Sequence, residues 1–164
     1  VCAAAGAWSS KLLNGLSSVQ VIPIKGHMLL FKLDRPLFSH IINEGNRYIV
    51  CRKDGHVLVG SSEEETGFDE SQSDLEIDRL KRFAQAMSTE LTEQNLIDVW
   101  TGLRPMAYDH LPYVGQHSEL PNMYVATGHF RSGLHLSPAT ADVICKSILG
   151  QELDFDISAL RPER

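Results

Sequence analysis

The sequence has few cysteines, no long apolar run and a shortage of positive charge, and each shortage excludes a class of protein. Its three cysteines, Cys2, Cys51 and Cys145, are too few and too widely spaced for a disulfide framework or a zinc site. No apolar run approaches the length of a membrane span and no signal peptide is visible, so we expect a cytoplasmic protein without membrane contact. With 15 Lys and Arg against 21 Asp and Glu, the formal net charge is -6, which argues against a nucleic-acid partner.

The chain also lacks an initiator methionine. It begins with small apolar residues at positions 1–5, followed by a turn at positions 6–9 and an expected short helix at positions 10–16. This start resembles the end of a buried strand that runs into a turn, and a strand rarely opens a domain so abruptly. We therefore expect a fragment of a longer protein, although 164 residues with 43% hydrophobic side chains suffice for a core.

One stretch predicts a ligand site. Residues 123–127 are apolar and predict a strand, Gly128 to Gly133 predict a turn, and a helix is expected from about Leu134 to Leu149, with Gly150 as its cap. Such a connection points backbone N–H groups and the positive end of the helix dipole towards an anionic or electron-rich group. An ordinary strand–turn–helix connection has the same pattern, and the stretch alone does not separate the two.

The remaining pattern favours an α+β fold. Residues 47–52 and 56–60 flank the pair Asp54-Gly55, which predicts a β-hairpin. A helix is expected over residues 74–91, capped by Asp74, with its apolar face on a sheet. We therefore predict a mixed, mostly antiparallel sheet with one long covering helix, plus a separate C-terminal helix.

Three further expectations concern loops and ends. Residues 61–72 predict a polar loop whose acidic side chains are solvated. The strand over residues 97–103 is expected to end at Arg104-Pro105, because proline cannot donate to a ladder. Residues 151–164 predict a tail on the surface.

Five short motifs occur along the chain in a fixed order. They are Gly6-Ala7-Trp8-Ser9, Pro23-Ile24-Lys25-Gly26, Tyr48-Ile49-Val50-Cys51-Arg52 with Asp54-Gly55, Trp100-Thr101-Gly102-Leu103-Arg104-Pro105, and Gly128-His129-Phe130-Arg131-Ser132-Gly133. To about residue 150, the chain resembles the C-terminal half of glycine oxidases, in the D-amino-acid-oxidase-like family of FAD-dependent amine oxidases. Those enzymes usually have proline where Cys51 stands. The chain lacks the Lys-containing glycine-rich turn of sarcosine oxidases and the second arginine motif of D-amino acid oxidases, which favours glycine oxidase.

The resemblance implies two domains and a cofactor. Residues 1–16 and 123–150 would belong to an FAD-binding domain, residues 17–122 to a substrate domain, and residues 151–164 to the tail. The glycine-rich phosphate-binding turn of the family is absent from the chain. The residues expected to contact FAD are Gly6, Gly128, His129, Phe130, Arg131, Ser132, Gly133 and Leu134.

Oxidation of an amino acid needs a hold on the carboxylate, a hydride acceptor and a neutral amine. Arg104 is the candidate for the first, because a planar guanidinium binds a carboxylate through two parallel bonds, although a surface arginine beside a turn is the alternative. The resemblance implies Tyr48 as a second donor, and Arg131 as a residue that adds positive charge or contributes its carbonyl. Without the resemblance, Tyr48 is equally well a half-buried tyrosine of the sheet. We name no catalytic base, because hydride can pass directly from the α-carbon of a neutral amine, and no metal site.

The leading hypothesis is an FAD-dependent oxidase of glycine or a similar small amine. It would give an imine that hydrolyses to the keto acid, with hydrogen peroxide formed from oxygen, and the family is linked to thiamine biosynthesis. One alternative is a dehydrogenase that passes electrons to another acceptor. The other is a non-catalytic scaffold or interaction domain. A homo-oligomer stays open.

Overall fold

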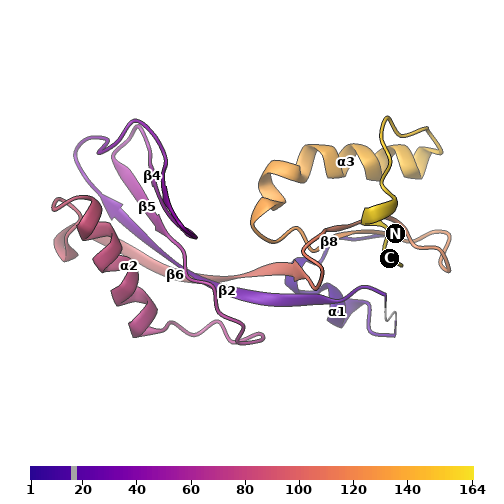
Figure 1. The fold of residues 1–164 in the computed structure, drawn as a ribbon, viewed down its shortest axis with the longest axis horizontal. Helices are drawn as coiled ribbons and strands as arrows, with labels where there is room; N and C mark the ends of the chain where they lie inside the picture. The colour runs from indigo at the N-terminus through magenta and orange to yellow at the C-terminus, as the bar shows by residue number, and fades with distance from the viewer. Residues whose placement is uncertain (16–17) are drawn as a thin grey trace. The chain divides into compact units, whose positions relative to one another are not determined.

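The computed structural model describes residues 1–15 and 18–164 (Figure 1). Its strands are β1 (Cys2–Ala3), β2 (Val21–Lys32), β3 (Ile42–Glu44), β4 (Arg47–Cys51), β5 (His56–Gly60), β6 (Leu96–Ala107), β7 (Tyr113–Gln116) and β8 (Tyr124–Thr127). Its helices are α1 (Ser9–Leu12), α2 (Asp74–Met87) and α3 (Gly133–Leu149), with 3₁₀ helices η1 (Gly6–Trp8), η2 (Glu93–Asn95), η3 (Phe130–Ser132) and η4 (Ser158–Leu160). The end of the first predicted helix, at position 16, lies outside the described residues.

The strands form two sheets. One has the order β3-β4-β5-β2-β6, and the other has the order β1-β8-β7. The pairs β2·β5, β3·β4, β4·β5 and β7·β8 are antiparallel, whereas β1 and β8 are parallel. The predicted α+β class with a mostly antiparallel sheet is confirmed.

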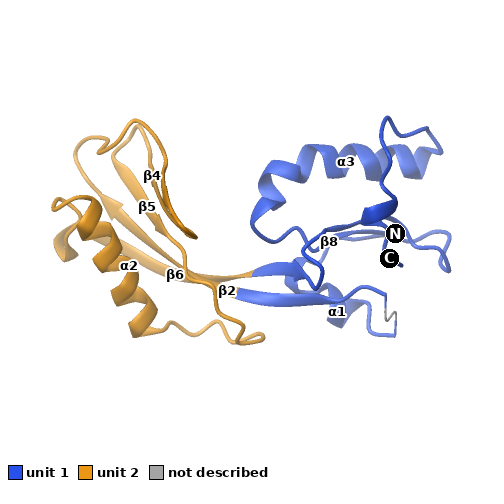
Figure 2. Ribbon diagram, viewed as in Figure 1, with its two compact units in different colours: residues 1–24, 104–164 blue, residues 25–103 orange. Residues whose placement is uncertain are grey.

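The chain divides into two compact units, coloured in Figure 2. Unit 1 comprises Val1–Ile24 and Arg104–Arg164, and unit 2 comprises Lys25–Leu103. The assignment of parts of the chain to an FAD-binding and a substrate domain stays a prediction.

The core of unit 2 lies between α2 and the sheet. Residues on one face of the helix pack against fully buried residues of β2, β4 and β5; the cluster includes Leu29, Phe31, Ile49, Val57, Val59, Ile77, Leu80, Phe83 and Ala84. The predicted hairpin is confirmed, since β4 pairs with β5 in the register Cys51↔Val57 and Ile49↔Val59. Gly55, with a φ of +86°, closes the turn. Local turn chemistry therefore fixes the register that presents the apolar face to α2.

Two boundaries in unit 2 differ from the prediction. The side chain of Ser73, rather than that of Asp74, caps α2 by accepting a hydrogen bond from the Glu76 amide. The helix ends at Met87, before the predicted position 91, because Ser88 has an extended backbone with a φ of -158°. Leu91 is nevertheless fully buried, which explains why its apolar character resembled a continuation of the helix.

The strand expected to stop at Arg104-Pro105 continues to Ala107. It lies at the edge of the five-stranded sheet, after β2 in the strand order. Proline is tolerated on edge strands because its missing N–H then faces no ladder partner. The prediction was wrong because the sequence did not show that this strand lies at an edge.

Unit 1 has two apolar clusters. One contains Ala3, Leu13, Val19, Val21, Ala107, Tyr113 and Val125. The other joins Val114 of β7 to Val143 and Ile144 of α3. Gly150 has a φ of +65° and accepts the left-handed conformation that ends α3, as predicted.

Most of the C-terminal residues after Gly150 are exposed, but a few of them pack against the rest of unit 1. Leu153, Ile157 and Leu160 contact the second cluster of unit 1, and Pro162 is fully buried. The guanidinium of Arg164 donates to both carboxylate oxygens of Asp109, at 2.7 and 2.9 Å. Three partly buried apolar side chains and a two-pronged ion pair therefore attach this largely exposed segment to the rest of unit 1.

No helix among the described residues is long and apolar enough to cross a membrane. In the same part of the chain, no group of three or more His, Cys, Asp or Glu side chains could hold a metal ion.

Substitution of Gly55 by alanine should destabilise the chain more than the same change at Gly67. Both glycines have positive φ, but a Cβ at Gly55 would lie 2.1 Å from the carbonyl oxygen of Leu33, whereas a Cβ at Gly67 would meet nothing within 4 Å. We expect Gly67→Ala to cost about 1–2 kcal/mol of unfolding free energy through its backbone conformation alone, and Gly55→Ala at least about 1 kcal/mol more. Urea unfolding of both variants measures the difference, and equal losses would contradict the packing account.

Candidate cofactor and substrate site

Two predicted cofactor-binding turns meet at one end of a parallel strand pair in unit 1. β1 pairs with β8 in the register Cys2↔Tyr124 and Ala3↔Val125. The turn at Gly6 follows β1, and the turn at Gly128 follows β8. The carboxyl ends of two parallel strands thus lie at the same edge, which is where ligands bind in open α/β sheets.

Buried hydroxyl groups hold the two turns together. The hydroxyl of Ser9 donates to Thr127 Oγ1 at 2.7 Å, and the Thr127 hydroxyl donates to the carbonyl oxygen of Gly6 at 3.1 Å. Ser9 and Thr127 are 0% and 1% exposed. Neither residue was predicted for the site, although Ser9 closes the motif that begins at Gly6 and Thr127 directly precedes Gly128, which is the signal that could have drawn attention to them.

The two turn glycines are required for different reasons. A Cβ at Gly128, where φ is +82°, would lie 3.0 Å from the Ala107 side chain and 3.3 Å from the Tyr113 ring. At Gly6, where φ is +54°, a Cβ would meet nothing within 4 Å. Gly128 is therefore demanded by packing inside unit 1, whereas Gly6 leaves open space beside its backbone for a ligand.

The segment after Gly128 leads into the N-terminus of α3. Phe130 has a φ of +50°, a left-handed conformation that is uncommon for a residue with a side chain and concentrates at binding sites. Arg131 and Ser132 are exposed, and Leu134 is 86% exposed. No side chain caps this helix end and no acidic residue lies in its first turn, so the described chain leaves the positive end of the dipole without a neutralising group.

His129 and Gly133 line a cavity of about 340 Å³ in unit 1. Cys2, Ala126 and residues of α3 form much of the remaining wall. His129 Nε2 lies 2.9 Å from Thr140 Oγ1, and burial lowers the pKa of this imidazole. His129 is therefore an uncharged, half-buried residue at neutral pH that anchors the turn to α3.

The end of β6 lies beside the same turn. Met106 and His129 form an antiparallel bridge, and the Ala107 amide donates to the Gly128 carbonyl at 3.5 Å. The half-buried Arg104 lies two residues before Met106 and so projects to the same side of the strand as Met106. The structure thus brings the segments that carry Arg104 and Arg131 together within unit 1.

Tyr48 belongs to unit 2. It is half-buried in β4, where it pairs with Asn43 of β3 and Gly60 of β5. Arg104 belongs to unit 1. A cavity shared by Tyr48 and Arg104 therefore stays a prediction.

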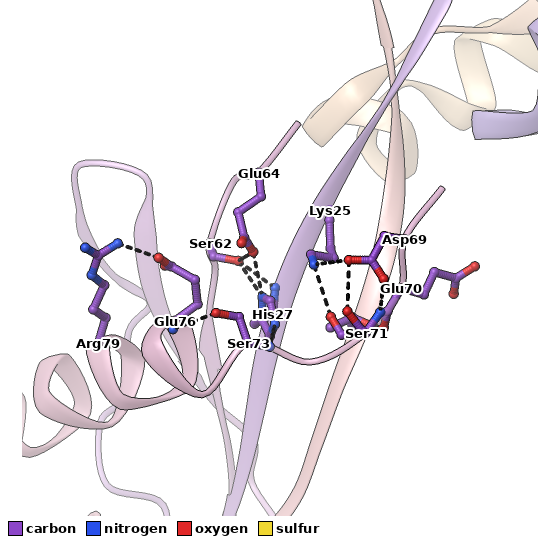
Figure 3. Close-up of polar contacts among 11 residues, drawn as sticks. Lys25, His27, Ser62, Glu64, Asp69, Glu70, Ser71, Ser73, Glu76 and Arg79 are labelled. Atoms are coloured by element: carbon purple, nitrogen blue, oxygen red, sulfur yellow. Dashed lines mark hydrogen bonds and ion pairs between the residues drawn. The ribbon is translucent and has the colours of Figure 1, made fainter. Parts of the chain in front are cut away.

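A polar cluster in unit 2 was not predicted (Figure 3). Lys25, 3% exposed, donates to Asp69 Oδ2 at 3.2 Å and to the Ser71 carbonyl at 3.1 Å. The Ser71 hydroxyl and amide, followed by Lys25, lower the pKa of Asp69 to about 2. The loop that was expected to be simply solvated is therefore tied to β2.

His27, which is fully buried, lies at the centre of this cluster. Its Nδ1 lies 2.8 Å from Ser62 Oγ and 3.1 Å from Glu64 Oε1, so Glu64 is not merely solvated as expected. Its Nε2 accepts a hydrogen bond of 2.8 Å from the amide of Ser73, the capping residue of α2. Because an amide only donates, Nε2 carries no proton, and the proton of the neutral ring is on Nδ1.

This arrangement excludes a hydrolytic triad. A triad needs the hydroxyl and the carboxylate on opposite nitrogens of the imidazole, but Ser62 and Glu64 both lie on the Nδ1 side. The second nitrogen is occupied by backbone. The cluster instead fastens the loop and the start of α2 onto β2.

A site at the carboxyl ends of parallel strands, below an uncapped helix N-terminus, is typical of proteins that bind nucleotide cofactors. Residues 1–147 match the family DAO, described as FAD dependent oxidoreductase, and the chain belongs to this family.

Similar proteins support this assignment. The chain is 34% identical over 163 residues to a glycine oxidase of Pseudomonas aeruginosa, with 99% of this chain and 45% of that protein covered. It is 32% identical over 157 residues to the hydrogen cyanide synthase subunit HcnC of the same species, with 94% and 38% covered. The crystal structure of glycine oxidase from Geobacillus kaustophilus matches with a TM-score of 0.92 at 32% identity, covering 100% of this chain and 45% of that one. The chain thus spans less than half the length of these relatives.

Acidification should destabilise the chain through His27. Burial lowers its pKa below the ordinary value of about 6.5, more than Glu64 raises it. Well above pH 6.5, the His27 imidazole is uncharged in both the folded and the unfolded chain. As the pH falls through 6.5, the unfolded chain takes up the second imidazole proton first, so the free energy of unfolding falls. The fall ends once the pH has passed the lowered pKa of His27 in the folded chain. One such proton contributes at most about 1.4 kcal/mol per pH unit.

The measurement is the free energy of urea unfolding between pH 7.5 and 5. We expect His27→Gln, whose amide can accept from Ser73, to flatten this dependence, and His40→Gln, at an exposed position, to leave it unchanged. A profile for His27→Gln that runs parallel to that of the unmodified chain would refute the assignment.

Proposed function

We propose that this chain is part of an FAD-dependent oxidase of glycine or a similar small amino acid or amine. The product would be an imine that hydrolyses to the keto acid, with hydrogen peroxide formed from oxygen. The observation that carries the proposal is the convergence of the Gly6 turn, the Gly128 turn and the end of β6 at the N-terminus of α3. The acidic charge and scarce cysteines support a cytoplasmic setting.

The residues around this convergence fit part of FAD. Open space beside Gly6, the cavity lined by His129 and Gly133, and an α3 N-terminus without acidic side chains suit an electron-rich, flat group. FAD, when bound, supplies the hydride acceptor of the reaction. The amides at the start of α3 and the positive charge of Arg131 would favour negative charge at the edge of the ring that they face.

Substrate binding would fall mainly to Arg104. Its guanidinium can donate two parallel hydrogen bonds to a carboxylate, which fixes the orientation of the α-carbon as well as the charge. Tyr48 would donate a further hydrogen bond through its hydroxyl. The half-buried position of Arg104 strengthens such bonds, because the surrounding dielectric is lower than that of water.

A dehydrogenase with an acceptor other than oxygen is the second candidate within the family. A hydrogen cyanide synthase subunit matches the chain at nearly the same identity as the glycine oxidases, so relatives named for different reactions occur in the family. Oxygen consumption by the full-length protein separates the two candidates. A non-catalytic scaffold predicts no turnover with either acceptor.

Replacement of Arg104 by lysine in the full-length protein should lower kcat/KM for glycine by about 10- to 100-fold. Lysine keeps the charge but loses the second parallel hydrogen bond, a loss of about 1.4–2.8 kcal/mol in binding the carboxylate. Arg82→Lys, at an exposed position of α2, is the matched control and should change nothing. Oxygen uptake measures both variants, and an unaltered kcat/KM for Arg104→Lys would remove Arg104 from the substrate site.

The 164-residue chain by itself should purify without stoichiometric flavin and without oxidase activity. It contains no Gly-x-Gly-x-x-Gly turn to cradle the pyrophosphate of FAD. Each 1.4 kcal/mol of lost contacts weakens binding about tenfold. Visible absorbance and solution mass are the measurements; Val1 and Leu134, exposed at 91% and 86%, also favour self-association. A yellow, monomeric chain would contradict both expectations.

A further inference from the structure

Three residues lie side by side on neighbouring strands of unit 2. Met28 of β2 pairs with Gly60 of β5, and Gly60 pairs with Tyr48 of β4. Residues at paired positions project to the same face of a sheet. Because Gly60 has no side chain, Met28 and Tyr48 meet above it, and the Tyr48 hydroxyl donates to Met28 Sδ at 3.3 Å.

The space above Gly60 is filled by these two side chains. A Cβ at Gly60 would lie 2.3 Å from Met28 Sδ, 2.9 Å from Met28 Cε and 3.1 Å from Tyr48 Cζ. Gly60 is not among the glycines with a positive φ, so a left-handed backbone is not what requires glycine here. Glycine is therefore needed here to let the methionine and the phenol ring touch.

The contact between Met28 and Tyr48 would allow the Tyr48 hydroxyl to exchange the sulfur for a stronger hydrogen-bond acceptor. A thioether sulfur is a weak acceptor, so it orients the phenol O–H without holding it tightly. A carboxylate is a much stronger acceptor and would take the hydrogen bond from the sulfur. An amide oxygen in place of the sulfur would compete better with the carboxylate.

We infer that Met28 is a positioning residue for Tyr48, and that Gly60 provides the slot in which it acts. The thioether holds the phenol ring and its hydroxyl in a defined orientation until the carboxylate of a small amino acid takes over the hydrogen bond. This inference rests on the proposed function, in which Tyr48 binds the substrate carboxylate.

The test uses the full-length protein and steady-state oxygen uptake with glycine. Tyr48→Phe should raise KM about tenfold with little change in kcat, because it removes a bond made to substrate and transition state alike. Met28→Gln should raise KM about three- to tenfold, because its amide oxygen competes with the carboxylate for the hydroxyl. Met28→Leu, which keeps the volume but no longer orients the hydroxyl, should raise KM by a smaller factor of about two to three. Met87→Leu, in α2, is the control and should have no effect.

The decisive comparison is Met28→Gln in the Tyr48→Phe background. Without the hydroxyl, the glutamine has no donor to capture, so the double variant should have the KM of Tyr48→Phe alone. An equal increase in both backgrounds would show that Met28 acts only through packing and would overturn the inference. If Tyr48→Phe leaves KM unchanged, Tyr48 does not bind the substrate, and the inference is wrong. The Arg104→Lys variant tests the remainder of the proposed function independently, through kcat/KM for glycine.

A second measurement needs neither flavin nor turnover. In the full-length protein with ¹³C-methyl-labelled methionine and no substrate, Tyr48→Phe should shift the Met28 resonance by more than it shifts that of Met87. An unmoved Met28 resonance would overturn the contact between sulfur and hydroxyl.

Discussion

The parallel pairing of β1 with β8 is the constraint on which the candidate site depends. It joins segments about 120 residues apart and aligns their carboxyl ends. The hydrogen bonds from Ser9 to Thr127 and from Thr127 to Gly6 then fix the two turns to one another in a place that water does not reach. Because buried hydroxyl groups without partners are expensive, loss of either bond would loosen both turns and the start of α3 together.

The structure of unit 2 depends on glycines that permit close packing and on a buried histidine. Gly55 permits the close approach of the turn to the Leu33 carbonyl, and Gly60 permits the contact of Met28 with Tyr48. His27 holds the residue that caps α2 by accepting a hydrogen bond from the Ser73 amide, while its other ring nitrogen faces Glu64. Tyr48 therefore lies in a sheet whose adjoining loops are held by side-chain hydrogen bonds as well as by apolar packing.

Local signals in the sequence predicted much of this fold. Asp54-Gly55 between apolar runs predicted the hairpin, and the pattern up to Gly150 predicted α3, because turn and cap chemistry act over a few residues. The chemistry of a guanidinium at a strand end suggested Arg104 as a site candidate, and the motif resemblance favoured Tyr48, which spacing alone did not. Contacts between distant segments could not be predicted. The continuation of β6 past Pro105 depends on its position at the edge of the sheet. The burial of Pro162 depends on partners far along the chain, and the role of Thr127 depends on the pairing of its strand with β1, which begins at residue 2.

The most direct test of the account is a crystal structure of the full-length protein with FAD and acetate, which is glycine without its amine. The account predicts that the acetate carboxylate lies within about 2.7–3.2 Å of the Arg104 guanidinium and the Tyr48 hydroxyl. It also predicts that the flavin ring lies against the backbone from His129 to Leu134. Acetate bound away from Arg104, or a flavin ring distant from the N-terminus of α3, would contradict the account.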